Sequence, residues 1–210
     1  MKKYDVIIVG AGPAGIFSVL ELLRHRADKK ILIIEKGKDL TERICPMKIR
    51  EISCTACPEC ALLSGWGGAG AFSDGKLNLS PEVGGFLSRY IDRDRLQSLI
   101  IYVDEIYVKY GAPEETYGGN KEEIHDIEKL ASENNLLFIP STIRHIGTDR
   151  CRIVLKNIKD TLNRRVETIF GSEADRVITE KRKAAGIRLK DGARLYSEFV
   201  ILAPGREGSR

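Results

Sequence analysis

The spacing of apolar and polar residues near the amino terminus predicts a strand, a helix and a second strand in succession. Residues 4–9 are a short apolar run rich in β-branched side chains, which is typical of a buried strand. Residues 16–23 carry apolar side chains at helical spacing, and residues 31–34 form a second apolar run. The pattern therefore predicts a βαβ unit at the start of an α/β domain.

A glycine-rich turn, G-x-G-x-x-G, connects the first predicted strand to the helix. We expect Gly10 to let the chain turn sharply, Gly12 to let a phosphate approach the backbone, and Gly15 to let the helix pack closely. The helix would begin at Pro13 and Ala14 and present free N–H groups and a partial positive charge to an anion. In this βαβ context, the motif predicts a dinucleotide site, and the alternative is a glycine turn in an ordinary parallel α/β domain.

An acidic residue, Glu35, follows the second predicted strand and lies 25 positions after Gly10. A carboxylate at this point can accept hydrogen bonds from ribose hydroxyls, and it favours an adenosine ribose that carries no 2′-phosphate. Lys36 follows directly and is also a candidate for cofactor binding. FAD and NAD are both bound by such a unit, so the unit alone leaves the choice between them open.

Composition excludes several classes of protein. The 210 residues suffice for one domain or one and a half, and 42% hydrophobic with 30% charged residues is ordinary for a globular protein. The net charge of +4 is scattered, so we expect no nucleic-acid partner. No apolar run approaches the about 20 residues that span a bilayer, and the glycine turn interrupts the only stretch that imitates a signal peptide. We expect a cytoplasmic protein without membrane contact and leave its oligomeric state open.

Four of the five cysteines lie within sixteen positions, at Cys45, Cys54, Cys57 and Cys60. The C-x-x-C-x-x-C spacing with a further thiol upstream suits an iron–sulfur cluster or tetrahedral zinc, and it also suits a redox-active dithiol. A cysteine-rich loop without such a function is the remaining alternative. Arg43, just before these cysteines, is a candidate for phosphate binding.

A second glycine-rich stretch covers residues 64–77 and contains Trp66 and Phe72 among its glycines. Such a segment lets the backbone approach a ligand closely and can direct several N–H groups at an anion. A flexible linker is the alternative, although linkers rarely contain large aromatic residues. The candidate binding residues here are Gly68, Gly70, Ser73, Asp74, Gly75 and Lys76.

The remainder of the chain predicts helices and then strands. We expect helices over about 91–110, 120–133 and 150–162, with Asp92 or Asp94 and then Asn120 as caps, and a strand over 136–139. His145 precedes the third helix and could contact a substrate or merely lie near a helix cap. Strands are expected over 166–170, 175–180, 185–189 and 199–202, with Asp191-Gly192 as a hairpin turn.

Several motifs together resemble a largely uncharacterised family of bacterial and archaeal FAD-dependent dehydrogenases. They are Cys45-Pro46, the cysteine triplet, residues 67–77, residues 144–149 and residues 203–209. The resemblance implies a glutathione-reductase-like FAD-binding fold, FAD as cofactor and redox chemistry on a small molecule. It also implies that the turn at Ala203 and Gly205 brings the chain back to the FAD, but it supplies no substrate.

The expected architecture is a Rossmann-like α/β domain for FAD or NAD(P) over 1–210, with a small antiparallel β-meander. Residues 41–90 would be a Cys- and Gly-rich insertion and residues 91–165 a mostly helical segment. Such folds usually continue further, so we expect an amino-terminal fragment. The expected function is an FAD-dependent oxidoreductase that exchanges electrons with an organic substrate or NAD(P)H. The alternatives are a non-catalytic redox-sensing module and an iron–sulfur electron-transfer protein.

Overall fold

The computed structural model describes residues 3–26, 28–205 and 208, and these residues divide into two compact units. The first contains the described residues of Met1–Phe72 and Leu155–Arg210, and the second is Ser73–Val154. The boundaries after Phe72 and Val154 fall inside the segments 41–90 and 91–165 that the composition suggested.

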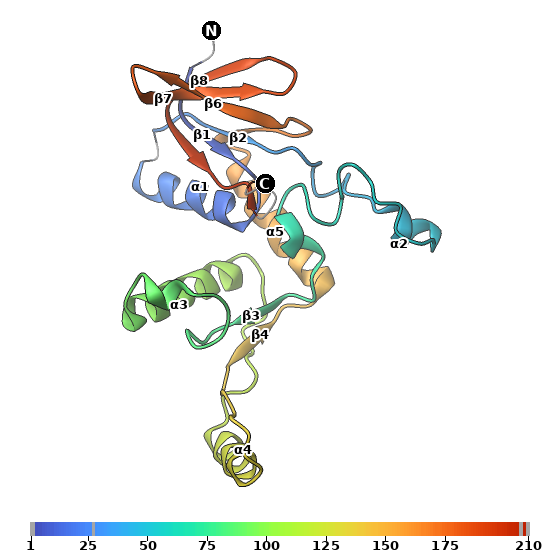
Figure 1. Cartoon of the computed structure of the whole chain (residues 1–210), viewed down its shortest axis with the longest axis vertical. Helices are drawn as coiled ribbons and strands as arrows, with labels where there is room; N and C mark the ends of the chain where they lie inside the picture. Colours follow the sequence, from blue (N-terminus) through green and yellow to red (C-terminus); the bar gives the residue numbers. More distant parts are fainter. Residues whose placement is uncertain (1–2, 27, 206–207, 209–210) are drawn as a thin grey trace. The chain divides into compact units, whose positions relative to one another are not determined.

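A six-stranded sheet in the order β5-β2-β1-β8-β7-β6 forms the centre of the first unit (Figure 1). The strands β5, β2, β1 and β8 run parallel, whereas β8, β7 and β6 pair antiparallel. The sheet confirms the predicted α/β class with its antiparallel extension. The strands are β1 (Lys3–Val9), β2 (Ile31–Ile34), β5 (Val166–Ile169), β6 (Ala174–Glu180), β7 (Lys183–Leu189) and β8 (Arg194–Leu202).

The core of the first unit lies around the two central parallel strands. All four residues of β2 are buried, and Ile7 and Ile8 of β1 have no exposed surface. Helix α1 (Pro13–His25) buries Ile16 and Val19. Strands covered on both faces need no polar side, which is why these two segments are continuous apolar runs in the sequence.

Strand β8 is longer than predicted and belongs to both parts of the sheet. Its first residues pair antiparallel with β7, and residues from Tyr196 to Leu202 pair in parallel with β1. The predicted turn at Asp191-Gly192 joins β7 to β8, with Gly192 at φ +90° and the Asp191 carboxylate accepting a hydrogen bond from the Ala193 N–H at 2.9 Å. The meander is thus continuous with the parallel sheet.

The second unit combines helices with a two-stranded antiparallel sheet of β3 and β4. The predicted caps are confirmed: the Asp92 carboxylate accepts a hydrogen bond from the Arg95 N–H at 2.8 Å, and the Asn120 side chain accepts one from the Glu122 N–H at 3.0 Å. Its elements are β3 (Lys76–Asn78), the 3₁₀ turn η2 (Leu87–Arg89), α3 (Arg93–Lys109), α4 (Lys121–Glu133), β4 (Ile143–His145) and the first part of α5 (Thr148–Leu162).

The predicted strand over 136–139 is wrong. These residues have irregular structure, and the side chain of Leu137 is 87% exposed. The apolar run suggested a strand, but none of the described strands pairs with it. Two short elements complete the first unit, α2 (Pro46–Arg50) and the 3₁₀ turn η1 (Gly68–Phe72). Within the described ranges, the helices lack the length and apolar composition that crossing a bilayer requires.

Candidate functional site

The three glycines of the first turn have the local environments that the motif predicts. Gly10 has φ +103°, and a Cβ there would lie 2.3 Å from the Ala203 carbonyl oxygen. A Cβ on Gly15 would lie 1.9 Å from the carbonyl oxygen of Gly10, so the helix packs closely on the turn. A Cβ on Gly12 would meet no atom within 4 Å. The backbone of Gly12 therefore faces open space that a ligand could fill.

The N-terminus of α1 begins at this open position. Gly12 is the N-cap and Pro13 the first helical residue, and the first turn carries no acidic side chain. The first intrahelical bond runs from the Ile16 N–H to the Gly12 carbonyl at 3.0 Å. The preceding N–H groups of the helix have no intrahelical acceptor and, with the helix dipole, favour an anion. The turn therefore has the geometry and the charge that bind a phosphate group.

Glu35 is buried, with 6% of its surface exposed, at the end of β2. Its Oε1 accepts hydrogen bonds from the N–H groups of Gly37 at 2.8 Å and Gly65 at 2.9 Å, and its Oε2 accepts one from Ala11 at 2.7 Å. An ionised carboxylate offers roughly four acceptor positions, so these three bonds leave about one, on Oε2. Glu35 thus joins three loops and keeps some capacity for a ribose hydroxyl.

The second glycine-rich segment packs directly against the first. The Gly67 N–H donates to the Ala11 carbonyl at 2.8 Å, and the Trp66 N–H donates to the Lys38 carbonyl at 3.1 Å. A Cβ on Gly68 would lie 3.2 Å from the Cα of Gly12. This close approach of two backbones explains the glycines at 67 and 68, and it excludes a flexible linker for residues 65–68.

Arg43 stabilises the contact between the two glycine-rich segments. It is not among the residues that line the neighbouring cavity. Its side chain is buried, and Nε donates to the Ala61 carbonyl at 2.9 Å. Nη1 donates to the carbonyls of Trp66 at 2.7 Å and Gly68 at 2.9 Å, and the guanidinium lies 4.7 Å from the centre of the Phe72 ring. These partners are different from the phosphate that the sequence suggested, and a phosphate contact of Arg43 stays a prediction.

A cavity of about 440 Å³ lies in the first unit where these elements meet. The carboxyl ends of β1, β2 and β8 all open into it, which is where parallel α/β sheets bind ligands. Ser172 and Glu173, which the sequence did not suggest, also line it. The predicted residues that line it are Gly10, Gly12, Pro13, Glu35, Lys36, Gly68, Gly70, Ala203 and Gly205.

The other predicted cofactor residues lie elsewhere. Ala14 and Gly15 belong to the first turn of α1 and do not line the cavity. Ser73, Asp74, Gly75 and Lys76 belong to the second unit, where Lys76 Nζ lies 2.9 Å from the Asp74 carboxylate and lowers its pKa. The cofactor contacts of these four residues stay predictions. Of the motif at 203–209, Arg206, Glu207 and Ser209 lie outside the described residues.

The four clustered cysteines are not assembled as a metal centre would require. All are free thiols, with Cys54 and Cys57 exposed and Cys45 and Cys60 partly buried. Within the described ranges, no three His, Cys, Asp or Glu side chains are placed to hold a metal ion. Residues 51–60 lie in irregular structure, so no helix or strand there brings the thiols together. The structure therefore does not fit the predicted iron–sulfur or zinc site.

In the second unit, Arg144 is a buried charged residue of β4, and His145 beside it is exposed. The Arg144 guanidinium donates to both oxygens of Asp104, at 2.5 and 2.6 Å, and to the Pro113 carbonyl at 2.5 Å. This bidentate pair raises the pKa of Arg144.

Cys151 is a buried thiol of helix α5 in the same unit. Burial raises the pKa of Cys151, in agreement with its predicted role as a small apolar residue.

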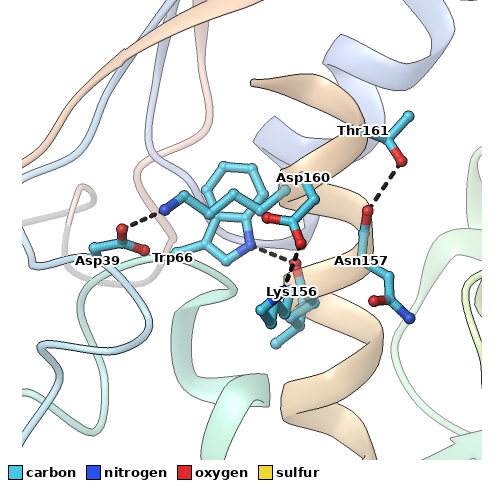
Figure 2. A network of polar contacts seen from close by, with 8 residues as sticks. Asp39, Trp66, Lys156, Asn157, Asp160 and Thr161 are labelled. Atoms are coloured by element: carbon cyan, nitrogen blue, oxygen red, sulfur yellow. Dashed lines mark hydrogen bonds and ion pairs between the residues drawn. The ribbon is translucent and has the colours of Figure 1, made fainter. Parts of the chain in front are cut away.

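Helix α5 supports the second glycine-rich segment through contacts that the sequence did not reveal. Trp66 is 1% exposed, and its Nε1 donates to the Leu155 carbonyl at 2.9 Å (Figure 2). Lys159 pairs with Asp39, and the Phe170 ring lies 6.5 Å from Trp66 in an edge-on arrangement. These partners are 89 to 120 residues apart along the chain, so no local pattern could have identified them.

Comparisons with known proteins agree with this fold. No family model matches the chain. An uncharacterised protein of Clostridium beijerinckii is 29% identical over 204 residues, which is 97% of this chain and 31% of that protein. The “Putative FAD-dependent oxidoreductase LodB” of Marinomonas mediterranea is 46% identical over 44 residues, 21% of this chain and 12% of that protein.

Solved structures of similar fold include a steroid dehydrogenase and an amino acid deaminase. A 3-ketosteroid-Δ4-(5α)-dehydrogenase from Rhodococcus jostii matches with a TM-score of 0.58 and 16% identity, over 95% of this chain and 45% of that one. An L-amino acid deaminase from Proteus vulgaris matches with a TM-score of 0.53 and 14% identity, over 98% of this chain and 48% of that one. The chain thus has their α/β fold and spans about half their length, and about a third of the Clostridium protein.

Proposed function

We propose that the first unit binds the adenosine and pyrophosphate part of FAD, and that the protein is an FAD-dependent oxidoreductase of the dehydrogenase type. The observation that carries the proposal is the environment of the three glycines. Gly10 and Gly15 have no room for a side chain, whereas Gly12 faces open space at the edge of a cavity. A glycine turn with a purely structural role gives no reason for that open space beside a helix N-terminus.

Specific residues would then hold the cofactor. The N-terminus of α1 at Gly12 and Pro13 would bind the pyrophosphate, and the remaining acceptor position on Glu35 Oε2 would take a ribose hydroxyl. The backbone of Gly68 and Gly70 would form the adjoining wall. Bound FAD would supply the hydride or electron transfer, while the protein orients the cofactor and excludes water.

The acid at Glu35 favours an adenosine ribose without a 2′-phosphate, because a second anion beside this carboxylate would be repelled. This argues against NADP in this cavity but does not separate FAD from NAD. The choice of FAD is supported by the resemblance to FAD-dependent dehydrogenases and by the name of the Marinomonas relative. We propose an organic small molecule or NAD(P)H as the electron partner of the whole protein.

An iron–sulfur or zinc centre at Cys45, Cys54, Cys57 and Cys60 is a separate proposal that the placement of the thiols does not support. Iron, zinc and labile sulfide analysis of the purified protein tests it. A stoichiometric metal content would restore the metal proposal without affecting the FAD site, because these cysteines are not among the residues that line the cavity.

Titration of the purified chain with FAD, followed by flavin fluorescence, tests the proposed function. We expect saturable one-to-one binding that ADP weakens by competition and that adenosine 2′,5′-bisphosphate weakens far less. If the chain binds NAD but not FAD, the proposal of a flavoenzyme is wrong and the protein is an NAD-binding protein. No binding of any adenine dinucleotide would overturn the proposal.

A further inference from the structure

A buried arginine holds the second glycine-rich segment by its backbone. Arg43 is 4% exposed, and three of its hydrogen bonds go to main-chain carbonyls, those of Ala61, Trp66 and Gly68, at 2.7 to 2.9 Å. The planar guanidinium presents five N–H donors in a fixed fork, so one side chain can fix several carbonyls at once. The Phe72 ring, 4.7 Å away, covers the same guanidinium.

The segment that Arg43 holds has little conformational preference of its own. Gly65, Gly67 and Gly68 all have positive φ, at +115°, +83° and +58°. Glycines in such conformations lose more backbone entropy on ordering than other residues, so the ordered state depends on contacts made from outside. Arg43 provides contacts on both sides of Gly67, through the carbonyls of Trp66 and Gly68.

The same segment lies against the glycine-rich turn at residues 10–15, where the pyrophosphate would bind. The Gly67 N–H bonds to the Ala11 carbonyl at 2.8 Å, and the Gly65 N–H bonds to Glu35 at 2.9 Å. Gly68 approaches Gly12 so closely that an added Cβ would lie 3.2 Å from its Cα, and both residues line the cavity. A displacement of the Trp66 and Gly68 carbonyls would therefore change the wall of the cavity next to the helix N-terminus.

We infer that Arg43 is a positioning residue for the dinucleotide site. It fixes the carbonyls of Trp66 and Gly68 so that the backbone of residues 68–70 forms a second wall of the cavity, next to Gly12. The inference rests on the proposed function. In place of a direct contact between Arg43 and phosphate, it has Arg43 act on the cofactor site by holding the backbone of the second glycine-rich segment. Lysine cannot substitute fully, because its ammonium group is a single point donor without the fork.

The test compares Arg43→Met and Arg43→Lys with a matched control, Arg144→Met. Arg144 is equally buried and also donates to main-chain carbonyls, but it belongs to the second unit. We expect the dissociation constant of FAD to rise at least about tenfold in Arg43→Met and less in Arg43→Lys, and to change less than about twofold in Arg144→Met. Thermal unfolding without ligand shows which variants are folded.

The fluorescence of Trp66 supplies a readout that a general loss of stability would not move. It is the only tryptophan of the chain, and it is buried in the segment that Arg43 holds. We expect its emission to shift to longer wavelength in the Arg43 variants at temperatures where they remain folded, and to stay unchanged in Arg144→Met. An unchanged emission, or wild-type FAD affinity in folded Arg43 variants, would overturn the inference.

A further variant keeps the test decisive if Arg43→Met does not fold. Gly68→Ala leaves Arg43 in place but adds a Cβ against Gly12, so it moves the same wall from another side. We expect weaker FAD binding in this variant as well, and wild-type affinity would count against the second wall. If the wild-type chain binds no FAD, the proposed function fails, whereas the Trp66 emission still decides whether Arg43 positions the segment.

Discussion

The carboxylate of Glu35 accepts a hydrogen bond from the backbone N–H of Ala11 at 2.7 Å and so joins the end of β2 to the turn between β1 and α1. The acid that the motif assigns to a ribose thus also fixes the backbone of the glycine-rich turn at Ala11. Because its other oxygen accepts hydrogen bonds from Gly37 and Gly65, one buried side chain connects this turn to the loops that contain those two glycines.

We expect Glu35→Gln to lower the free energy of unfolding by about 2–3 kcal/mol, because hydrogen bonds to a charged group are lost and the amide NH₂ faces a backbone donor. FAD binding should weaken in the same variant, since both the turn and the ribose acceptor change. Chemical denaturation measures the first effect. Glu198→Gln, at an exposed position of β8, is the control and should stay within about 0.5 kcal/mol of wild type. Equal stability of the two variants would contradict the structural role of Glu35.

Gly12→Ala separates binding from folding. Gly12 has φ −75° and ψ −178°, which alanine adopts readily, and its Cβ would meet open space. We expect stability to stay unchanged or rise by about 0.4–1 kcal/mol. FAD affinity should fall roughly tenfold, because the methyl group occupies the path of the pyrophosphate. Gly119→Ala, which would make only ordinary contacts with Thr142 and is not among the residues that line the cavity, should change neither quantity.

Gly15→Ala should lower the stability of the fold, whereas Gly12→Ala should not. A Cβ here would lie 1.9 Å from the Gly10 carbonyl oxygen and 3.4 Å from the Ile8 side chain, so α1 must move away from the sheet. We expect a loss of about 1–3 kcal/mol of stability, as for other overpacked sites. Thermal unfolding measures it, with Ser18→Ala on the same helix as the control. A folded Gly15→Ala protein with wild-type stability would show that the helix packs less closely than the structure indicates.

The parts of the fold that depend on local sequence could be predicted, and those that depend on distant contacts could not. The local environments of Gly10, Gly12 and Gly15 follow from one short motif, and the caps at Asp92 and Asn120 follow from their neighbours. Residues 136–139 have the composition of a strand, but a strand also needs a partner that the local sequence cannot specify.

The candidate site shows the same limit. Gly68 could be identified because its close approach to the backbone of Gly12 requires glycine. Gly70 belongs to the same glycine-rich segment, and both residues line the cavity. The role of Arg43 could not, because its partners at 61, 66 and 68 are carbonyls, which every residue possesses. The spacing of the four cysteines indicated a shared site, but spacing alone does not bring thiols together in irregular structure.

The buried thiol of Cys151 should make the protein sensitive to alkaline pH. Burial is the main cause that raises the pKa of Cys151, with a smaller contribution from the negative charge of Asp74, and burial also raises the pKa of the neighbouring Tyr107. Above about pH 8.5, the unfolded chain loses the thiol proton while the folded chain keeps it. The folded state then binds more protons, so the free energy of unfolding falls as the pH rises.

Thermal midpoints measured from pH 7 to pH 10 test this effect. They should decline less steeply in Cys151→Ala than in wild type, whereas Cys54→Ser, at an exposed cysteine, should follow wild type. Parallel curves for wild type and Cys151→Ala would show that this thiol is not the group responsible.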